Sequence, residues 1–295
     1  MKHLLRGLLL IILLLPMGVF AQSEGDITID DIENAFANIF KNDSVRVEGV
    51  SQIDQSLTIS GMTILQSITQ DITGEMTFAE GVLTGLTSSI TQNVTSDTAG
   101  TITEGGMLME LIYVDEILYM RVSDTSGVLA GTFPEGWINL NTDADTVEGL
   151  ALINVDTLLS TFDQPLMYPL NEETVLNFEM VDVDPELEFA EGTVAYLVEI
   201  NAEAAFAAGN FAEMFSGFEE VGIDMEDLLN QLMEGAELST VVYLLDGQLI
   251  GIASAMVLDA DITIQGQTMT LVQNITSVQK YTDFNFELEI TAPEE

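Results

Sequence analysis

The chain has 295 residues, with 49 Asp and Glu against 6 Lys and Arg, no cysteine and one histidine, His3. A formal net charge of −43 repels phosphate backbones and anionic headgroups, which argues against nucleic-acid binding and against polybasic membrane docking. A hydrophobic content of 47% argues against disorder and supplies a large core. The acidity is interpreted as a means of staying soluble, and the alternatives are a cationic partner surface or many weak divalent-cation sites.

The first 21 residues are typical of a secretory signal peptide. Lys2 and Arg6 precede an unbroken apolar run, Leu8 to Leu15, and Val19 and Ala21 hold the two positions that a signal peptidase reads. We therefore expect residues 1–21 to be removed and residues 22–295 to form a single domain. The absence of a lipobox cysteine predicts a released protein, periplasmic or extracellular, that does not insert stably in a membrane.

A helix is expected first after the leader. Apolar residues recur at helical spacing, namely Ile32, Phe36, Ile39 and Phe40, and the acidic residues that precede them suit a helix N-terminus. From Ser44 to about Asn141 the sequence is rich in Thr, Ser, Ile and Val with turn residues between, which predicts antiparallel strands.

Within this region the segment Ser67–Thr73, SITQDIT, recurs as Ser89–Thr95, SITQNVT. Because only two copies are visible, the repeat indicates neighbouring strands of a meander rather than a solenoid.

Further elements follow in the second half of the chain. Asn154 is suited to cap a helix, and strands are expected at Val175–Val183 and Thr193–Ile200, the first with Leu176, Phe178 and Met180 on one face. Two apolar stripes then predict helices over residues 211–218 and 225–232, the second capped by Asp224.

The end of the chain returns to strand patterns. Val241 to Leu258 contains Asp246-Gly247 and is interpreted as a hairpin, and Phe286, Leu288 and Ile290 alternate with polar residues as in a strand with one wet face. The fold class is therefore α+β: a strongly curved antiparallel sheet, an open half-barrel, with about four helices on its concave face.

This order of elements resembles the periplasmic lipoprotein carriers of the LolA-like family and the related LppX/LprG-like lipid carriers. The similarity is carried by short motifs, namely Ile112-Tyr-Val-Asp-Glu-Ile-Leu-Tyr-Met-Arg121, Gly136-Trp137-Ile138, Asp156-Thr-Leu-Leu159, Tyr281-Thr-Asp-Phe284 and Ile290-Thr-Ala-Pro293. The resemblance implies an open half-barrel whose helices enclose an apolar space for acyl chains. It leaves Arg46 and Arg121 as the arginines available to a headgroup clamp.

The composition offers few of the side chains that catalysis requires. Without His or Cys after the leader, a Ser-His-Asp triad and a zinc site are both excluded. With 49 acidic residues, paired carboxylates arise by chance, and the acidic run from Asn141 to Asp145 lacks the Gly and Glu that a calcium loop requires. We expect a protein that is not an enzyme and holds no metal or cofactor.

Apolar side chains of the two late helices and the segment before them are the best candidate ligand site, because Met and Phe adapt to irregular ligands. The candidate ligand-binding residues are Phe206, Phe211, Met214, Phe215, Phe218, Leu228 and Leu232. The same stripes also suit an ordinary core. The sequence thus predicts an exported, non-catalytic carrier or binding protein for a hydrophobic ligand such as a lipid or acyl chain. The alternative is an exported structural or surface-interaction protein whose half-barrel is filled by its own side chains.

Overall fold

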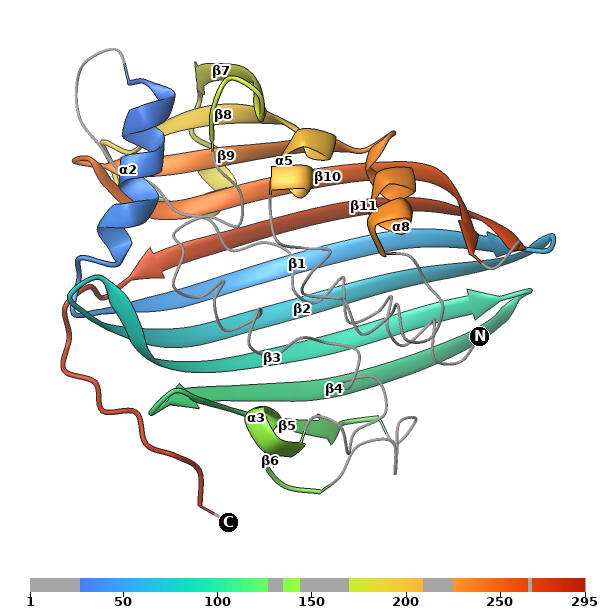
Figure 1. Ribbon diagram of the computed structural model, residues 1–295, viewed down its shortest axis with the longest axis horizontal. Helices are drawn as coiled ribbons and strands as arrows, with labels where there is room; N and C mark the ends of the chain where they lie inside the picture. The colour runs from blue at the N-terminus through green and yellow to red at the C-terminus, as the bar shows by residue number, and fades with distance from the viewer. Residues whose placement is uncertain (1–26, 127–134, 144–169, 209–224, 265–266, 295) are drawn as a thin grey trace.

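A computed structural model describes residues 27–126, 135–143, 170–208, 225–264 and 267–294. Its main feature is one 11-stranded sheet in the order β6-β5-β4-β3-β2-β1-β11-β10-β9-β8-β7 (Figure 1). Every neighbouring pair is antiparallel, and the two ends of the sheet are not joined. The prediction of a curved, open antiparallel sheet with a few helices is therefore confirmed.

The sheet consists of two meanders joined where the first strand pairs with the last. The first meander comprises β1 (Ser44–Ile59), β2 (Met62–Ala79), β3 (Val82–Thr98), β4 (Thr101–Val114), β5 (Ile117–Asp124) and β6 (Ile138–Asn139). The second comprises β7 (Val175–Val181), β8 (Val194–Asn201), β9 (Glu237–Leu245), β10 (Gln248–Ile264) and β11 (Gln267–Thr282).

Tight turns connect the long hairpins. Both residues of the Ser60-Gly61, Glu80-Gly81, Ala99-Gly100 and Asp246-Gly247 turns have positive φ, the geometry whose twist matches that of the flanking strands. The last of these confirms the hairpin predicted over residues 241–258. The SITQDIT and SITQNVT segments pair directly with each other, Ser67 opposite Thr95 and Thr73 opposite Ser89, so the predicted meander is also confirmed.

Three helices pack on one side of the sheet: α2 (Ile29–Ile39), α5 (Ala202–Ala208) and α8 (Met225–Met233). Buried residues of α2 pack with Val45 and Val47 of β1, and buried residues of α8 pack with Leu57 and Ile59. These four residues of β1 alternate along one strand and so share a face. We call it the inner face and the opposite side the outer face. That the inner face is the concave one stays a prediction.

The first predicted helix is α2, and it begins with a reciprocal cap. The Thr28 hydroxyl accepts from the Asp31 N–H (3.3 Å), and the Asp31 carboxylate accepts from the Thr28 N–H (2.9 Å). The Thr28 N–H and the Thr28 hydroxyl both donate to the Asp31 carboxylate, and these two hydrogen bonds hold the pKa of Asp31 below its usual value. The cap satisfies backbone donors that the first helical turn leaves without partners.

We expect Thr28→Ala to lower the free energy of unfolding by about 1 kcal/mol, because the first turn of α2 loses its side-chain acceptor. Denaturant titration measures the change, and Thr28→Ser, which keeps the hydroxyl, is the matched control. Equal losses in the two variants would show that the cap does not stabilise α2.

Other predicted elements differ from the structure. In β7 a register shift lies between Val175 and Asn177, so Leu176 has no directly opposite residue. Phe178 and Met180 pair opposite Val198 and Tyr196 and share one face, as predicted, although Leu176 and Met180 are each 69% exposed. Residues 284 and 285 form a turn, and in residues 286–290 apolar side chains alternate with exposed acids, but these residues join no strand ladder. They lie on the outer face instead, with Phe286 against Arg46 and Ile290 over Gly85.

Two further predictions concern helices. The helix predicted over residues 225–232 is α8, whereas α5 and the short α3 (Leu140–Asp143) were not predicted. The helices predicted after Asn154 and over residues 211–218 lie outside the described residues.

Candidate functional site

The inner face of the sheet is free of charge along its long strands. Because side chains alternate between the two faces, the pairing registers assign every Asp, Glu, Lys and Arg of β1–β4 and β8–β11 to the outer face. In a chain with 49 acidic residues, this segregation leaves a broad surface of apolar and neutral polar groups beneath the helices.

Neutral polar side chains form two rows across the middle of the inner face, which we call the polar band. The first row crosses six strands and consists of Thr240, Ser254, Ser277, Ser51, Gln70 and Gln92. The second row consists of Gln273, Gln55 and Gln66. Ile275, Ile53 and Ile68 lie between the rows, in register on the same three strands as the second row.

Hydrogen bonds link the polar band from strand to strand. The Gln70 amide donates to Gln92 Oε1 (3.2 Å), and the Gln273 amide donates to Gln55 Oε1 (3.2 Å). The Gln55 amide donates in turn to Gln66, and the hydroxyls of Thr240 and Ser254 lie 3.1 Å apart. Gln92 is 1% exposed, so its amide is as buried as the isoleucines around it.

The polar band can bind neutral polar atoms. Each glutamine amide offers two donor hydrogens and an oxygen with two acceptor sites, which is more than one cross-strand bond uses. Such groups suit esters, hydroxyls and amides, and they offer no counter-charge to an ion. The period-2 pattern could have indicated this surface, since Gln70 lies between Ile68 and Ile72, and Gln92 between Ile90 and Val94.

Apolar clusters flank the polar band and contain part of the predicted ligand site. Leu228 and Leu232 of α8 are each 5% exposed and pack with Leu258 and Ile262 of β10, and Phe206 of α5 packs half-buried against the same cluster. The structure thus brings three predicted residues together. Phe211, Met214, Phe215 and Phe218 lie outside the described residues.

A hollow of about 510 Å³ opens beside α5 and α8. Leu176, Met233, Leu238 and Val257 contribute apolar walls, and the acidic side chains around it are Glu199, Glu203, Glu234 and Glu237. An anion entering this hollow would be repelled by four carboxylates, of which Glu199 and Glu237 belong to the outer face.

Arg46 and Arg121, the arginines available to a headgroup clamp, lie on the outer face and not beneath the helices. Each pairs with a glutamate, Arg46 with Glu75 (2.8 Å) and Arg121 with Glu110 (2.6 Å). They therefore do not support a clamp on the inner face. Within the described ranges, no three acidic or histidine side chains come together as a metal site would require.

Near the α2 end, Tyr281 of β11 is a buried ionisable group of the inner face. It is 3% exposed, and its hydroxyl donates to Gln279 Oε1 (3.1 Å). Burial raises the pKa of this phenol above its ordinary value of about 10. Burial likewise raises the pKa of Tyr196 and Tyr243.

The raised pKa of Tyr281 predicts alkaline sensitivity. A phenol that is harder to ionise when folded contributes stability below pH 10 that is lost as the pH rises further, because the unfolded chain releases the proton first. We expect the free energy of unfolding to fall less steeply in Tyr281→Phe than in the wild type between about pH 10 and 12. Denaturant titrations across this range measure the slopes. Equal slopes would contradict the prediction.

Comparisons with known proteins give no family. No family model and no curated protein matches the chain. A structure described as lipid–protein interactions in lipovitellin is 9% identical over 84% of this chain, with a TM-score of 0.35; the match spans 26% of the lipovitellin chain.

Two further solved structures are similar at the same low level. A DUF1329 family protein from Desulfovibrio piger is 11% identical over 87% of this chain and 90% of its own, with a TM-score of 0.23. The translocator domain of the autotransporter NalP from Neisseria meningitidis is 7% identical over 80% of this chain and 88% of its own, with a TM-score of 0.22. At these scores the likenesses carry no argument about function.

Among the described residues, no helix is both long and apolar enough to span a bilayer.

Proposed function

We propose that the protein is an exported, non-catalytic carrier or binding protein for a hydrophobic ligand held between the inner face and the helices. The observation that carries the proposal is the charge-free inner face of eight long strands in a chain of net charge −43. A surface of this kind favours apolar chains and disfavours ions.

The polar band narrows the ligand to neutral amphiphiles, such as a glyceride or another neutral ester of fatty acids. Its amides can bond ester and hydroxyl oxygens, while the apolar clusters on both sides contact the chains. The net charge of −43 disfavours fatty-acid anions and phospholipids of net negative charge.

In this proposal Phe206, Leu228 and Leu232 belong to a helical cover together with Phe211, Met214, Phe215 and Phe218. Residues 1–21 direct export to the periplasm or the medium, and residues 22–295 act as a single domain. A LolA-like or LppX-like relationship remains part of the proposal, as does the concave position of the helices.

The alternative is a scaffold whose sheet is filled by its own side chains. The burial of Ile53, Ile68 and Gln92, each 1% exposed, favours this alternative, because covered side chains leave no room for a ligand at those points. The two functions differ in whether a ligand can be taken up.

Competition for an apolar fluorescent probe tests the proposal. The wild type is expected to bind the probe. A monoacylglycerol is expected to displace the bound probe, whereas the matched fatty-acid anion is not. Absence of probe binding favours the scaffold, and equal displacement by both amphiphiles contradicts a neutral ligand.

A further inference from the structure

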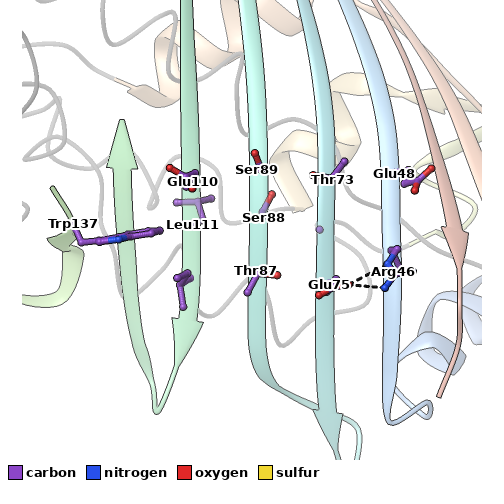
Figure 2. A pocket seen from close by; sticks show the side chains of 12 residues that line it. Arg46, Glu48, Thr73, Glu75, Thr87, Ser88, Ser89, Glu110, Leu111 and Trp137 are labelled. Atoms are coloured by element: carbon purple, nitrogen blue, oxygen red, sulfur yellow. Dashed lines mark hydrogen bonds and ion pairs between the residues drawn. The ribbon is translucent and has the colours of Figure 1, made fainter. Parts of the chain in front are cut away.

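The outer face carries a hollow of about 340 Å³ on the side of the sheet opposite to the helices. Figure 2 shows it across β1–β4, with Trp137 beside β5. One register row runs through Glu48, Thr73, Ser89, Glu110 and Arg121, and the next runs through Arg46, Glu75, Thr87 and Ile112.

The hollow exists because short side chains lie between long ones. Thr73, Thr87 and Ser89 form a floor of hydroxyls on β2 and β3. Arg46, Glu48 and Glu75 stand on the β1 side of this floor, and Glu110 and Trp137 stand on the other side.

Ion pairs fix one carboxylate in each wall, Glu75 on the β1 side and Glu110 on the other. Arg121 binds Glu110 in a two-point arrangement, with Nε at 2.6 Å and Nη2 at 2.7 Å from the two carboxylate oxygens. Arg46 donates to Glu75 through Nε (3.1 Å) and Nη2 (2.8 Å), and to Asp283. Each carboxylate keeps free acceptor sites, which form charge-assisted hydrogen bonds with hydroxyl donors.

Trp137 gives this polar hollow one aromatic surface. The guanidinium of Arg121 lies 4.7 Å from the centre of the indole ring. Trp137 lines the hollow whereas Arg121 does not, so part of the indole surface is turned to the hollow. An aromatic side chain beside carboxylates and hydroxyls suits a ligand with one apolar face and several hydroxyl groups.

We propose that this outer hollow binds a neutral sugar ring, one hexopyranose unit, with the indole of Trp137 against its C–H face. The hydroxyls of the sugar would bond Glu48, Glu110 and the floor residues. The hollow is near the lower limit of ligand-pocket volumes, which fits one ring and not an acyl chain. A sugar acid or phosphate is disfavoured because both arginines are already paired and the chain has a net charge of −43.

The test uses the single tryptophan of the chain. In nitrogen-15-labelled protein Trp137 gives the one indole N–H signal, which neutral methyl hexopyranosides (glucoside, galactoside and mannoside) are expected to shift saturably below about 50 mM with at least one sugar. Thr73→Val removes a floor hydroxyl without changing the side-chain shape and is expected to weaken that binding about fivefold to tenfold.

Thr69→Val is the matched control, because Thr69 is exposed on the same face of β2 but does not line the hollow. It is expected to bind as the wild type does. Three results would overturn the proposal: no saturable shift with any neutral sugar, a shift that requires an anionic sugar, or equal affinity of the two valine variants. None of these results bears on the ligand of the inner face.

Discussion

Replacing Phe36 by alanine will lower the free energy of unfolding by about 3–5 kcal/mol, the cost of removing a packed aromatic side chain from a core. Phe36 is 2% exposed and packs in one buried cluster with Val45, Val242 and Leu249, so α2 is attached to both meanders through it. Denaturant titration measures the loss.

Phe206→Ala is the matched substitution at the predicted ligand site, and its expected result is different. Phe206 is only half-buried, on a helix of seven residues, so its loss should cost less than that of Phe36 while it weakens binding of an apolar probe. If both alanine variants destabilise the protein equally and the wild type binds no probe, the ligand-binding role of Phe206 is wrong and the scaffold interpretation stands.

Two variants of the polar band are expected to differ strongly in stability. Gln92→Ala leaves the Gln70 amide without its acceptor in a buried position, which should cost about 1–3 kcal/mol. The double variant Gln70→Leu/Gln92→Leu removes both partners and restores volume, so we expect no loss of stability and even a gain. Denaturant titration of the two variants measures this difference.

Binding by the same double variant tests what the polar band does. We expect it to take up an apolar probe but to lose the preference for an ester- or hydroxyl-bearing amphiphile. If its preference matches that of the wild type, the polar band does not contact the ligand and only joins the strands.

Much of the sheet could be predicted because local chemistry determines it. Gly residues after Ser60, Glu80 and Asp246 permit the tight turns, and the alternation of Ile with Thr and Asp orients each strand. The charge-free inner face is also marked in the sequence, since Gln70 and Gln92 keep the spacing of the isoleucines beside them, but a pattern read from apolar residues alone leaves these glutamines out.

Other features depend on contacts that no local pattern contains. The register shift at Leu176 in the edge strand β7 takes this residue out of the ladder, and nothing in the segment itself marks the shift. Phe286 and Ile290 have the alternation of a strand, but this alternation is equally satisfied when an extended segment lies across the outer face against Arg46 and Gly85. The registers of β1 with β2 and of β4 with β5 place Arg46 and Arg121 on the face opposite to the helices, where the tail also lies.

Mass spectrometry of the lipids extracted from protein purified without detergent tests the central claim most directly. The account predicts a neutral amphiphile at about one molecule per chain, reduced in Phe206→Ala and changed in composition in Gln70→Leu/Gln92→Leu. Extracts without lipid, from a wild type that also binds no apolar probe, would contradict it.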